Sequence, residues 1–479
     1  MTHRIVVLGA GYAGLAAAKR AAGRLRGTDA RVTLVNAADR FVERVRLHQL
    51  AAGQALADLP LATLLEGTGV ELVIARVTGI DLPTRRVRLD AAPYELSYDT
   101  LVYALGSGAD LDGVPGVREH AFNVATADEA LRLRAALTGS PAPAGDARPQ
   151  AGSPAVTVAG DARPQAGGPA VAGDARPQVG SPAVTFAGDA RPQTGGPAVA
   201  GDARPRAGNP AVASGGVGLP REASPALAHG GDRLRAAAEG GPTVVVVGGG
   251  LTGIEAAAEL AETHRNLKVE LVTGDRVAAN LSGRARLHLF RSFHRLGVKV
   301  REQVVIGEVT GEGLVLDDGR GLPADAVVWA AGFAVPGLAA QAGLATDARG
   351  RMIVDDTLRS VSHPEVFGVG DAAAAAAAGG LARMSCQTGI PMGLSAGNAI
   401  ADLVAGRDPA TARIRYVWTN ISLGRRDGVT QFTRADDSPL GDAVLTGRAS
   451  ALFKEFITRG TVLTMRHPGP YLPFRRPGR

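Results

Sequence analysis

Short apolar runs alternate with Ala-rich segments along the chain, and they do so in the same order in both halves. A short apolar run rich in β-branched residues predicts a buried strand, and apolar positions three or four residues apart predict a helix. The pattern predicts a strand, a helix and a strand over 4–8, 14–22 and 31–35, and again over 243–247, 253–262 and 269–272. Two such βαβ openings predict an α/β fold with two Rossmann-like, doubly wound domains.

A repeat rich in proline and glycine separates the two halves. The phrase AGDARP begins five times, at Ala144, Ala159, Ala172, Ala187 and Ala200. Each copy contains Pro and Gly and no stripe of large apolar residues, so this segment cannot bury a core of its own. We predict a disordered linker over 140–232, which a surface loop tolerates well. A role in docking a partner stays open.

A glycine-rich turn joins the first predicted strand to the first predicted helix. In GAGYAG, Gly9 permits a tight turn, Gly11 lets the backbone approach a pyrophosphate, and Gly14 lets the helix pack closely on the strand. The free amides and partial positive charge at the helix N-terminus favour phosphate. The strand, the glycines and the helix together predict a dinucleotide site.

The end of the second predicted strand departs from the usual dinucleotide pattern. A carboxylate normally stands there to bind the adenosine ribose, and this chain has Asn36 instead. An asparagine amide still forms hydrogen bonds with hydroxyl groups, so Asn36 is a candidate ribose ligand. Arg40 lies just beyond, and we interpret it either as a phosphate ligand or as half of a surface ion pair.

The second half repeats the glycine pattern in GGGLTG, with Gly248, Gly250 and Gly253. A second dinucleotide site is therefore predicted. No carboxylate stands at the usual place after the next strand, where Asp275 is a candidate for a ribose hydroxyl and Arg276 for a 2′-phosphate. The choice between NADH and NADPH stays open.

A third motif follows the apolar run 366–369, which ends in Gly370 and Asp371 before a run of alanines. We predict a helix over the alanines, which would place the carboxylate beside a helix N-terminus. There it could accept hydrogen bonds from the ribityl hydroxyls of a flavin. With the two glycine motifs, this predicts FAD at the first site and a nicotinamide dinucleotide at the second.

These motifs resemble those of the flavoproteins with two dinucleotide-binding domains, and within them the type II NADH dehydrogenase group. The segments LVYALG at 101–106 and AVVWAAG at 326–332 are similar to the family's crossings between its domains. The stretch 41–53, which contains RLHQLAAG, is similar to the family segment under the flavin ring. The likeness covers the chain except for the repeat and the C-terminal region.

The resemblance implies roles for single residues. It places Val77 against the adenine, Glu255 near the nicotinamide, and Gln387, in CQTG, near a quinone pocket. Glu255 is also explained as a first-turn acid that complements its helix dipole. The candidate catalytic residues are Glu255 and Gln387. The candidate cofactor ligands are Gly9, Gly11, Gly14, Asn36, Arg40, Val77, Ala104, Gly106, Gly248, Gly250, Gly253, Gly332, Gly370 and Asp371.

The same features predict the domain ranges. An FAD-binding domain is expected in two parts, over 1–139 and 346–405, on either side of the linker and of an NAD(P)-binding domain over 240–345. A C-terminal α+β region is expected over 406–479.

The cysteine count narrows the chemistry. Disulfide reductases and sulfide:quinone reductases of this architecture need two redox cysteines near the flavin, and this chain has only Cys386. We therefore exclude both reactions and interpret Cys386 as an inert thiol in a reducing compartment. Nine histidines without HxxxH spacing, and a chain without CxxC, predict no metal site.

Charge and hydropathy bear on the partners. The net charge is +6, and cations gather from Lys454 onward, where we expect a solvated tail, with lipid or phosphate contact as the alternative. No basic patch with interleaved aromatics predicts nucleic-acid binding. Residues 5–18 imitate a secretory signal, but they contain the first glycine motif, so we expect no cleavage. The longest uncharged run, 326–346, is too broken for a membrane helix.

The C-terminal region contains one short apolar stripe. A helix predicted over 449–457 has Leu452, Phe453, Phe456 and Ile457 on one face, and we expect Gly460 to end it. The stripe is then expected to pack against the FAD domain or a second subunit. We expect a cytoplasmic protein. A homodimer and peripheral contact with the inner face of the cell membrane stay open.

The function these features predict is transfer of a hydride from NADH or NADPH to FAD, and of electrons onward to a quinone-like acceptor. Two alternatives remain. One is a reductase for a small electron-transfer protein such as a ferredoxin. The other is a non-catalytic flavoprotein that senses nicotinamide or binds a partner.

Overall fold

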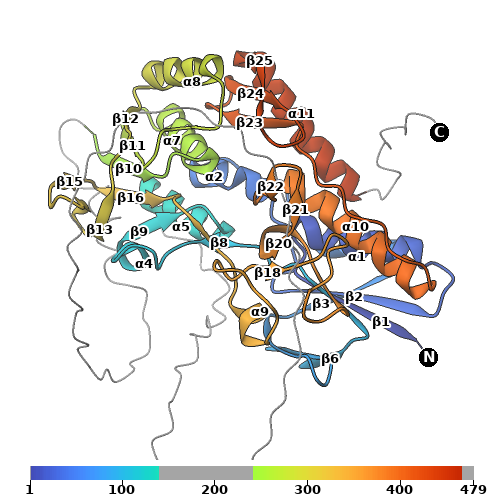
Figure 1. The fold of residues 1–479 in the computed structure, drawn as a ribbon. Coiled ribbons are helices and arrows are strands. Elements are labelled where there is room, and N and C mark those ends of the chain that lie inside the picture. The colour runs from blue at the N-terminus through green and yellow to red at the C-terminus, as the bar shows by residue number, and fades with distance from the viewer. Residues whose placement is uncertain (1, 140–240, 467–479) are drawn as a thin grey trace, which may run out of the picture. The chain divides into compact units, whose positions relative to one another are not determined.

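Two five-stranded parallel sheets carry both glycine motifs in the computed structural model, which describes residues 2–139 and 241–466 (Figure 1). The predicted repeat linker lies outside the described residues. Both sheets are built in the same way: a central strand leads through a glycine turn into a helix that packs on the sheet.

The first sheet has the strand order β19-β7-β1-β2-β3, and every pairing in it is parallel. Its strands are β1 (His3–Leu8), β2 (Ala30–Asn36), β3 (Val70–Ile74), β7 (Thr100–Tyr103) and β19 (Val366–Gly368). Because β19 comes from late in the chain, it brings Gly370 and Asp371 to the same sheet edge as Gly9.

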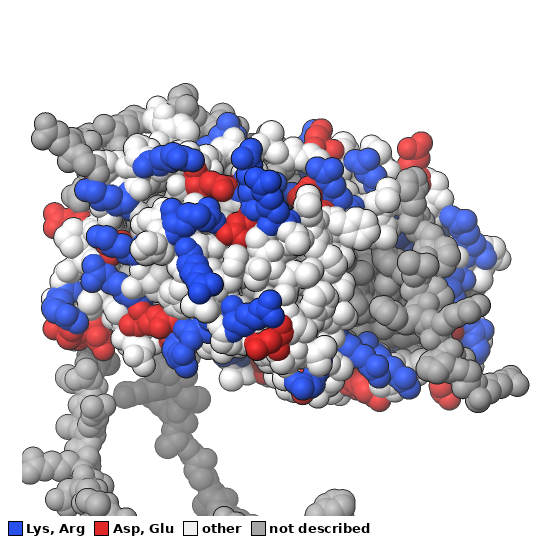
Figure 2. Space-filling model, turned by 90° about the horizontal axis from the view of Figure 1, so that it is seen from above, with Lys and Arg blue, Asp and Glu red and all other residues white. Residues whose placement is uncertain are grey.

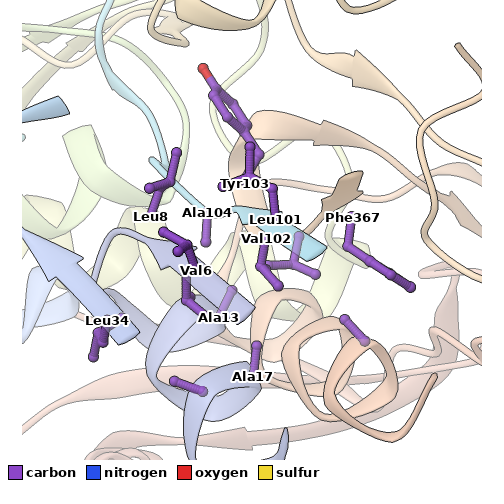
Figure 3. Close-up of a cluster of buried hydrophobic side chains, with 14 of the residues drawn as sticks. Val6, Leu8, Ala13, Ala17, Leu34, Leu101, Val102, Tyr103, Ala104 and Phe367 are labelled. Carbon is purple, nitrogen blue, oxygen red and sulfur yellow. The ribbon is translucent and has the colours of Figure 1, made fainter. Parts of the chain in front are cut away.

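Helices α1 (Tyr12–Arg24) and α10 (Cys386–Val404) pack closely together on this sheet. Figure 3 shows side chains of β1, β7 and β19 above the small residues Ala13 and Ala17 of α1. The small residues matter because the helices nearly touch: a Cβ on Gly393 of α10 would lie 2.1 Å from the Ala13 carbonyl oxygen.

The second sheet has the order β12-β11-β10-β16-β9, again with parallel pairings throughout. Its strands are β9 (Ala121–Asn123), β10 (Thr243–Val247), β11 (Lys268–Val272), β12 (Lys299–Arg301) and β16 (Ala326–Trp329). Helix α7 (Leu251–Thr263) follows β10 as α1 follows β1, and α8 (Gly283–Leu296) comes after β11. The predicted α/β fold with two Rossmann-like sheets is confirmed.

The domain ranges stay predictions. Within the range 1–139, strand β9 pairs with β16 of the second sheet, and the helix α5 (Ala127–Thr138) packs in the same core as α7. Residues 121–138 therefore lie with the second sheet, although they precede the linker.

Smaller elements complete the two halves. Antiparallel sheets are formed by β4 (Val77–Asp81), β5 (Arg86–Leu89) and β6 (Glu95–Ser97), and by β13 (Ile306–Thr310), β14 (Gly313–Leu316) and β15 (Gly321–Pro323). The crossings meet as the pair β8 (Gly108–Ala109) and β17 (Phe333–Ala334). The remaining short elements are η1 (Arg44–Arg46), α2 (Leu47–Ala51), α3 (Leu61–Leu65), α4 (Val117–His120), α9 (Leu338–Gln341), β18 (Met352–Ile353), η2 (Gly370–Ala372), β20 (Ala373–Ala374), β21 (Ala376–Ala377) and β22 (Gly380–Leu381).

The C-terminal region is an antiparallel sheet and one long helix. The strands β23 (Trp418–Ser422), β24 (Gly428–Thr433) and β25 (Pro439–Thr446) lead into α11 (Gly447–Arg466). Phe453 of α11 packs edge-to-face on Trp418, with ring centroids 5.4 Å apart. This contact holds one face of α11 on the sheet.

The alanine run after Asp371 is not a helix, which corrects the sequence-based expectation. A 3₁₀ turn is followed by the short strands β20 and β21 instead, and β20 pairs in parallel with β18. Ala373 and Ala374 are buried. The helix propensity of alanine is a weak preference that burial and strand pairing override here.

Gly460 does not end the C-terminal helix, which is a second correction. The helix α11 continues to Arg466. At its end the ammonium of Lys19, a buried residue of α1, donates hydrogen bonds to the carbonyl oxygens of Met465 and Arg466. A glycine inside a helix costs about 1 kcal/mol, and a cation on the last carbonyls offsets such a cost.

The contact between α1 and α10 yields a test of the packing. Gly393→Ala should lower the free energy of unfolding by about 1–3 kcal/mol, because the added methyl has no room against the Ala13 carbonyl. Gly23→Ala in α1 is the matched control, since no atom lies within 4 Å of its added Cβ. The control should be neutral or slightly stabilising. Urea unfolding of both variants measures this, and equal stabilities would contradict the close contact.

Candidate functional site

The first glycine turn has room for a ligand only on one side. Gly9 has a φ of +95°, and a Cβ there would lie 2.5 Å from the Ala104 carbonyl oxygen. A Cβ on Gly14 would lie 1.9 Å from the Gly9 carbonyl oxygen. A Cβ on Gly11, by contrast, would meet nothing within 4 Å, and no side chain caps the helix that begins after Gly11. The free amides of α1 can therefore meet a phosphate.

The second turn repeats this geometry. Gly248 has a φ of +127°, and a Cβ there would lie 2.6 Å from the Ala330 carbonyl oxygen. A Cβ on Gly253 would lie 2.0 Å from the Gly248 carbonyl oxygen, whereas Gly250 faces open space and precedes an uncapped helix. Both turns thus fit a dinucleotide pyrophosphate by the same steric logic.

Asp371 lies at the carboxyl edge of the first sheet and is held by two polar neighbours. Its carboxylate accepts hydrogen bonds from Ser107 Oγ at 2.7 Å and from Arg44 Nη1 at 3.3 Å. The Arg44 guanidinium lies 5.4 Å from the Phe333 ring centre, and its Nη2 is buried without a partner in the described part of the chain. Burial lowers the pKa of Arg44. An unpaired buried donor beside a carboxylate fits the phosphate and hydroxyl groups of FAD.

Asn36 and Arg40 are both engaged by the protein. Asn36 Oδ1 accepts a hydrogen bond from the Ala10 amide at 2.9 Å, so its side chain holds the glycine turn. Arg40 forms ion pairs with Asp39 and Asp58 and is half exposed. The structure thus favours the surface ion pair for Arg40, and Arg44 is the arginine that lies beside Asp371.

The remaining candidate ligands lie at the two sheet edges. Ala104 and Gly106 follow β7 beneath the first turn, and Gly370 precedes Asp371. Val77 is the first residue of β4. Two residues earlier, the Ala75 amide donates a hydrogen bond to the carbonyl of Asn36, so Val77 lies near the end of β2. Gly332 follows β16 at the edge of the second sheet.

Glu255 is the centre of a buried charged cluster. It lies near the start of α7 and is almost completely buried. Its Oε1 accepts a hydrogen bond from the Ser422 amide at 2.9 Å and forms an ion pair with Lys454 of α11. The His48 Nδ1 of α2 lies 3.7 Å from its Oε2. Four segments far apart in the sequence therefore meet at one carboxylate.

His48 adds a neutral imidazole to this cluster. Burial lowers the pKa of His48 to about 4, against the opposing effect of Glu255. It is therefore uncharged near neutral pH, and its Nε2 has no hydrogen-bond partner among the described residues. A neutral imidazole beside a carboxylate can accept or relay a proton.

Gln387 and Cys386 begin α10 beside the C-terminal sheet. Gln387 Nε2 donates to the Trp418 carbonyl at 3.2 Å, and its Oε1 is buried without a partner in residues 2–139 and 241–466. Gln387 is therefore not joined to Glu255 by any hydrogen bond in the structure. Burial raises the pKa of Cys386, as expected for an unreactive thiol.

A pocket of about 460 Å³ opens beside the Glu255 cluster. Segment 45–49, the turn between β23 and β24 and the helix α11 form its walls. Lys454 and Ser422 belong both to this lining and to the shell of Glu255. Cations dominate the lining, with Arg46, Arg425, Arg426 and Arg448 beside Lys454 and one acid, Glu455.

Several of these residues were not among the sequence-based candidates. His48 and Arg44 were visible only as part of the stretch 41–53, and Ser107 belongs to no motif. Lys454 was assigned to a solvated tail, but its side chain is only 15% exposed and paired with Glu255, which corrects that expectation. In the described part of the chain, no three His, Cys, Asp or Glu side chains are placed to hold a metal ion.

The family comparison matches residues 3–149 and 224–393 to the pyridine nucleotide-disulphide oxidoreductase family. An NADH dehydrogenase-like protein of Mycobacterium tuberculosis is 31% identical over 446 residues, which cover 89% of this chain and 87% of the relative. A type II NADH:quinone oxidoreductase of Staphylococcus epidermidis is 36% identical over 124 residues, 25% of this chain and 30% of that protein. The resemblance inferred from the motifs is confirmed.

Solved structures share the fold. The sulfide:quinone oxidoreductase of Aquifex aeolicus matches with a TM-score of 0.66 at 16% identity, covering 97% of this chain and 92% of that one. An NDH2 of Plasmodium falciparum in complex with NADH matches with a TM-score of 0.64 at 13% identity, covering 97% of this chain and 98% of that one. At such identities the likeness shows the fold alone.

The pairing of Glu255 with Lys454 gives a test of the site. Lys454→Met should lower the free energy of unfolding at neutral pH by about 3 kcal/mol, because it leaves a buried carboxylate without its cation. Adding Glu255→Gln should restore much of this loss, since the uncompensated charge is then gone. Denaturant unfolding of the two single variants and the double variant measures the coupling.

The control for this cycle is Lys299→Met. Lys299 is 71% exposed and lies 3.6 Å from Glu270, so its loss should cost less than about 1 kcal/mol. Additive effects of the Lys454 and Glu255 substitutions would contradict the buried ion pair.

Proposed function

The chain belongs to the pyridine nucleotide-disulphide oxidoreductase family, and we propose that it carries electrons from a reduced nicotinamide dinucleotide through FAD to a quinone. It is an FAD-dependent oxidoreductase, as its family and its NADH dehydrogenase-like relatives indicate. The observation that carries the proposed acceptor is the pocket of about 460 Å³ that shares Lys454 and Ser422 with the shell of Glu255.

The proposed cofactor contacts follow from the two sheet edges. The first glycine turn would hold the FAD pyrophosphate, and Asp371 with Arg44 would hold the hydroxyls and phosphates beside it. The second turn would hold the nicotinamide dinucleotide. When bound, FAD supplies the redox chemistry, taking a hydride from the nicotinamide and giving electrons to the acceptor.

Glu255 is proposed to act between donor and acceptor. It lies one turn into α7, the helix that follows the second glycine turn. This places it near the proposed site of the nicotinamide dinucleotide. Through Lys454 it is also linked to the wall of the pocket. A carboxylate in this place can orient the donor and handle a proton for the acceptor. Gln387, which bonds to Trp418, is proposed to support the pocket through the C-terminal sheet.

A quinone suits the pocket because α11, which forms one of its walls, has exposed apolar side chains. Leu452 and Phe456 of α11 are 71% and 73% exposed, and Leu463 follows on the same helix face at 58%. Leu452 and Phe456 therefore do not pack against the FAD domain, and the alternative of packing against a second subunit stays a prediction. An apolar helix face beside the pocket suits a lipid-soluble acceptor and peripheral contact with a membrane.

The surface charge also favours peripheral contact with a membrane. Helices α8 and α11 lie at the top of Figure 1, and Figure 2 looks down on them. Basic side chains gather over that face, with fewer acidic ones among them (Figure 2). Basic residues near exposed apolar ones favour an anionic lipid surface. None of the described helices is long and apolar enough to cross a bilayer.

A reductase for a small acidic electron-transfer protein is the second candidate. The basic face in Figure 2 would also attract such a partner. The exposed side chains of Leu452, Phe456 and Leu463 favour the membrane and the quinone over this alternative.

The function is tested by mixing the flavin-loaded protein anaerobically with NADH and, separately, with NADPH. Loss of the flavin absorbance with one donor, reversed by a short-chain quinone, is the expected result. It also identifies the donor that Asp275 and Arg276 leave open. Absorbance that returns only with an added ferredoxin would favour the second candidate, and no loss with either donor would contradict the proposal.

The exposed face of α11 is tested by Phe456→Ser and Leu463→Ser, because neither side chain lines the pocket. Each should weaken binding to anionic lipid vesicles by roughly tenfold to a hundredfold, because burying one such side chain contributes about 1.5–3 kcal/mol. Turnover of a water-soluble short-chain quinone should stay unchanged. Val361→Ser is the control, since Val361 is 57% exposed but lies in another part of the chain. Vesicle sedimentation measures the binding, and equal binding by all variants would contradict membrane contact through α11.

A further inference from the structure

Glu259 is a buried carboxyl group that the proposed function has not yet used. It lies on α7, one turn after Glu255, and is 0% exposed. The amide of Gln54 donates a hydrogen bond to its Oε1. Its Oε2 has no hydrogen-bond partner among the residues that the structure describes. A fully buried acid with one neutral partner is costly to ionise.

The charged groups around Glu259 do not provide its carboxyl with a cation in direct contact. Glu255 has its own cation in Lys454, and the carboxylate of Glu262 accepts a hydrogen bond from the Arg425 amide at 2.5 Å. No ion pair with Glu259 is formed within residues 2–139 and 241–466. The charged and titratable groups that face this region are Glu255 and Glu262 on α7, His48 on α2, Arg425 on the β23–β24 turn and Lys454 on α11.

Burial is the largest influence on the carboxyl of Glu259. It raises the pKa to about 7, with further increases from Glu262 and Glu255 and opposing effects from Arg425 and the Gln54 amide. A carboxyl with this pKa gains and loses its proton near neutral pH. Glu259 differs in this from Glu255, which forms an ion pair with Lys454.

Glu259 also lies near the acceptor pocket. The Gln54 backbone amide donates to the Gln49 carbonyl at 2.9 Å, and Gln49 and Arg425 both line the pocket. On the other side, residues four apart on a helix have neighbouring side chains, about 5–6 Å apart at Cβ, so Glu259 neighbours Glu255. Glu259 is thus linked to the pocket lining through Gln54 and Gln49, and it neighbours Glu255 on α7.

We propose that Glu259 holds at Oε2 the proton that is needed, besides the transferred hydride, to reduce the acceptor. The inference rests on the proposed function. Reduction of a quinone to a quinol takes two electrons and two protons, and the hydride brings both electrons but only one proton. The second proton is released from the carboxyl of Glu259 toward the pocket. Water that enters through the pocket then supplies a proton that restores this carboxyl. The balance is one reduced nicotinamide, one proton and one quinone giving one oxidised nicotinamide and one quinol. Glu259 is a positioning residue for this proton, not a group that touches the acceptor.

The test compares a quinone with ferricyanide as acceptor, since ferricyanide takes electrons without protons. Wild-type quinone turnover should fall as the pH rises through about 7, where Glu259 loses its proton. Glu259→Gln should lose this pH dependence and turn over quinone about a hundredfold more slowly below pH 7, within the range for a missing proton-transfer group. Its ferricyanide turnover should equal that of the wild type. Glu259→Asp should restore part of the pH dependence.

Glu262→Gln is the matched control. It removes a carboxylate from the same helix but leaves the carboxyl of Glu259 in place. The fall in quinone turnover with rising pH should therefore persist at a somewhat lower pH, because Glu262 contributes to the raised pKa of Glu259. A Glu259→Gln enzyme with the wild-type pH profile would overturn the proton role alone. Loss of both quinone and ferricyanide turnover in Glu259→Gln would also overturn it, because that result indicates a general structural defect. Wild-type protein that reduces ferricyanide but no quinone would instead contradict the proposed acceptor.

The pH dependence of the melting temperature is an independent readout. A carboxyl with a raised pKa stabilises the folded state at low pH relative to high pH, and that stability is lost as the pH rises through about 7. Glu259→Gln removes the titrating group, so its melting temperature should vary less between pH 5 and 8 than that of the wild type. An unchanged pH dependence of melting would contradict the buried, titrating carboxyl on which the proposal stands.

Discussion

The buried carboxylate of Glu255 is the constraint on which the arrangement around the site depends. A charge removed from water needs a cation and hydrogen-bond donors, and here they come from α11 and β23, with the imidazole of α2 beside them. Because these partners lie far apart in the sequence, satisfying one carboxylate fixes the C-terminal region against the second sheet. The pocket beside the cluster is lined by the same segments, so its shape depends on the same contacts.

The glycine turns could be predicted from sequence because their requirements are local. Gly14 is needed because any Cβ would collide with the carbonyl of Gly9, five residues earlier, and the same relation holds between Gly253 and Gly248. The order of strand, turn and helix then specifies the sheet edge at which a dinucleotide can bind. The parallel fold followed from this pattern, which also predicts both dinucleotide sites, and Asp371 lies after a strand that ends at the same edge.

The rest of the site depends on contacts that the sequence does not reveal. Lys454 stands in a basic stretch and looks solvated until α11 folds back on Glu255, 199 residues earlier in the chain. Gly460 was expected to end a helix, but the ammonium of Lys19 holds the carbonyls one turn later. The alanines after Asp371 favour a helix, and strand pairing prevents it. In each case a distant partner outweighs a local preference of about 1 kcal/mol or less.

The cluster around Glu255 consists of charged and titratable side chains, and the chain has only one cysteine and so no cysteine pair to add to it. Members of a family named for disulphide chemistry can pass electrons through a cysteine pair, but this chain has one cysteine, and burial raises the pKa of its thiol. A single cysteine cannot form such a pair within the chain. At the segment expected under the flavin ring, His48 stands beside Glu255, with Glu259 one turn further along α7. A chain that lacks sulfur chemistry at this place thus keeps buried proton-binding groups next to its pocket.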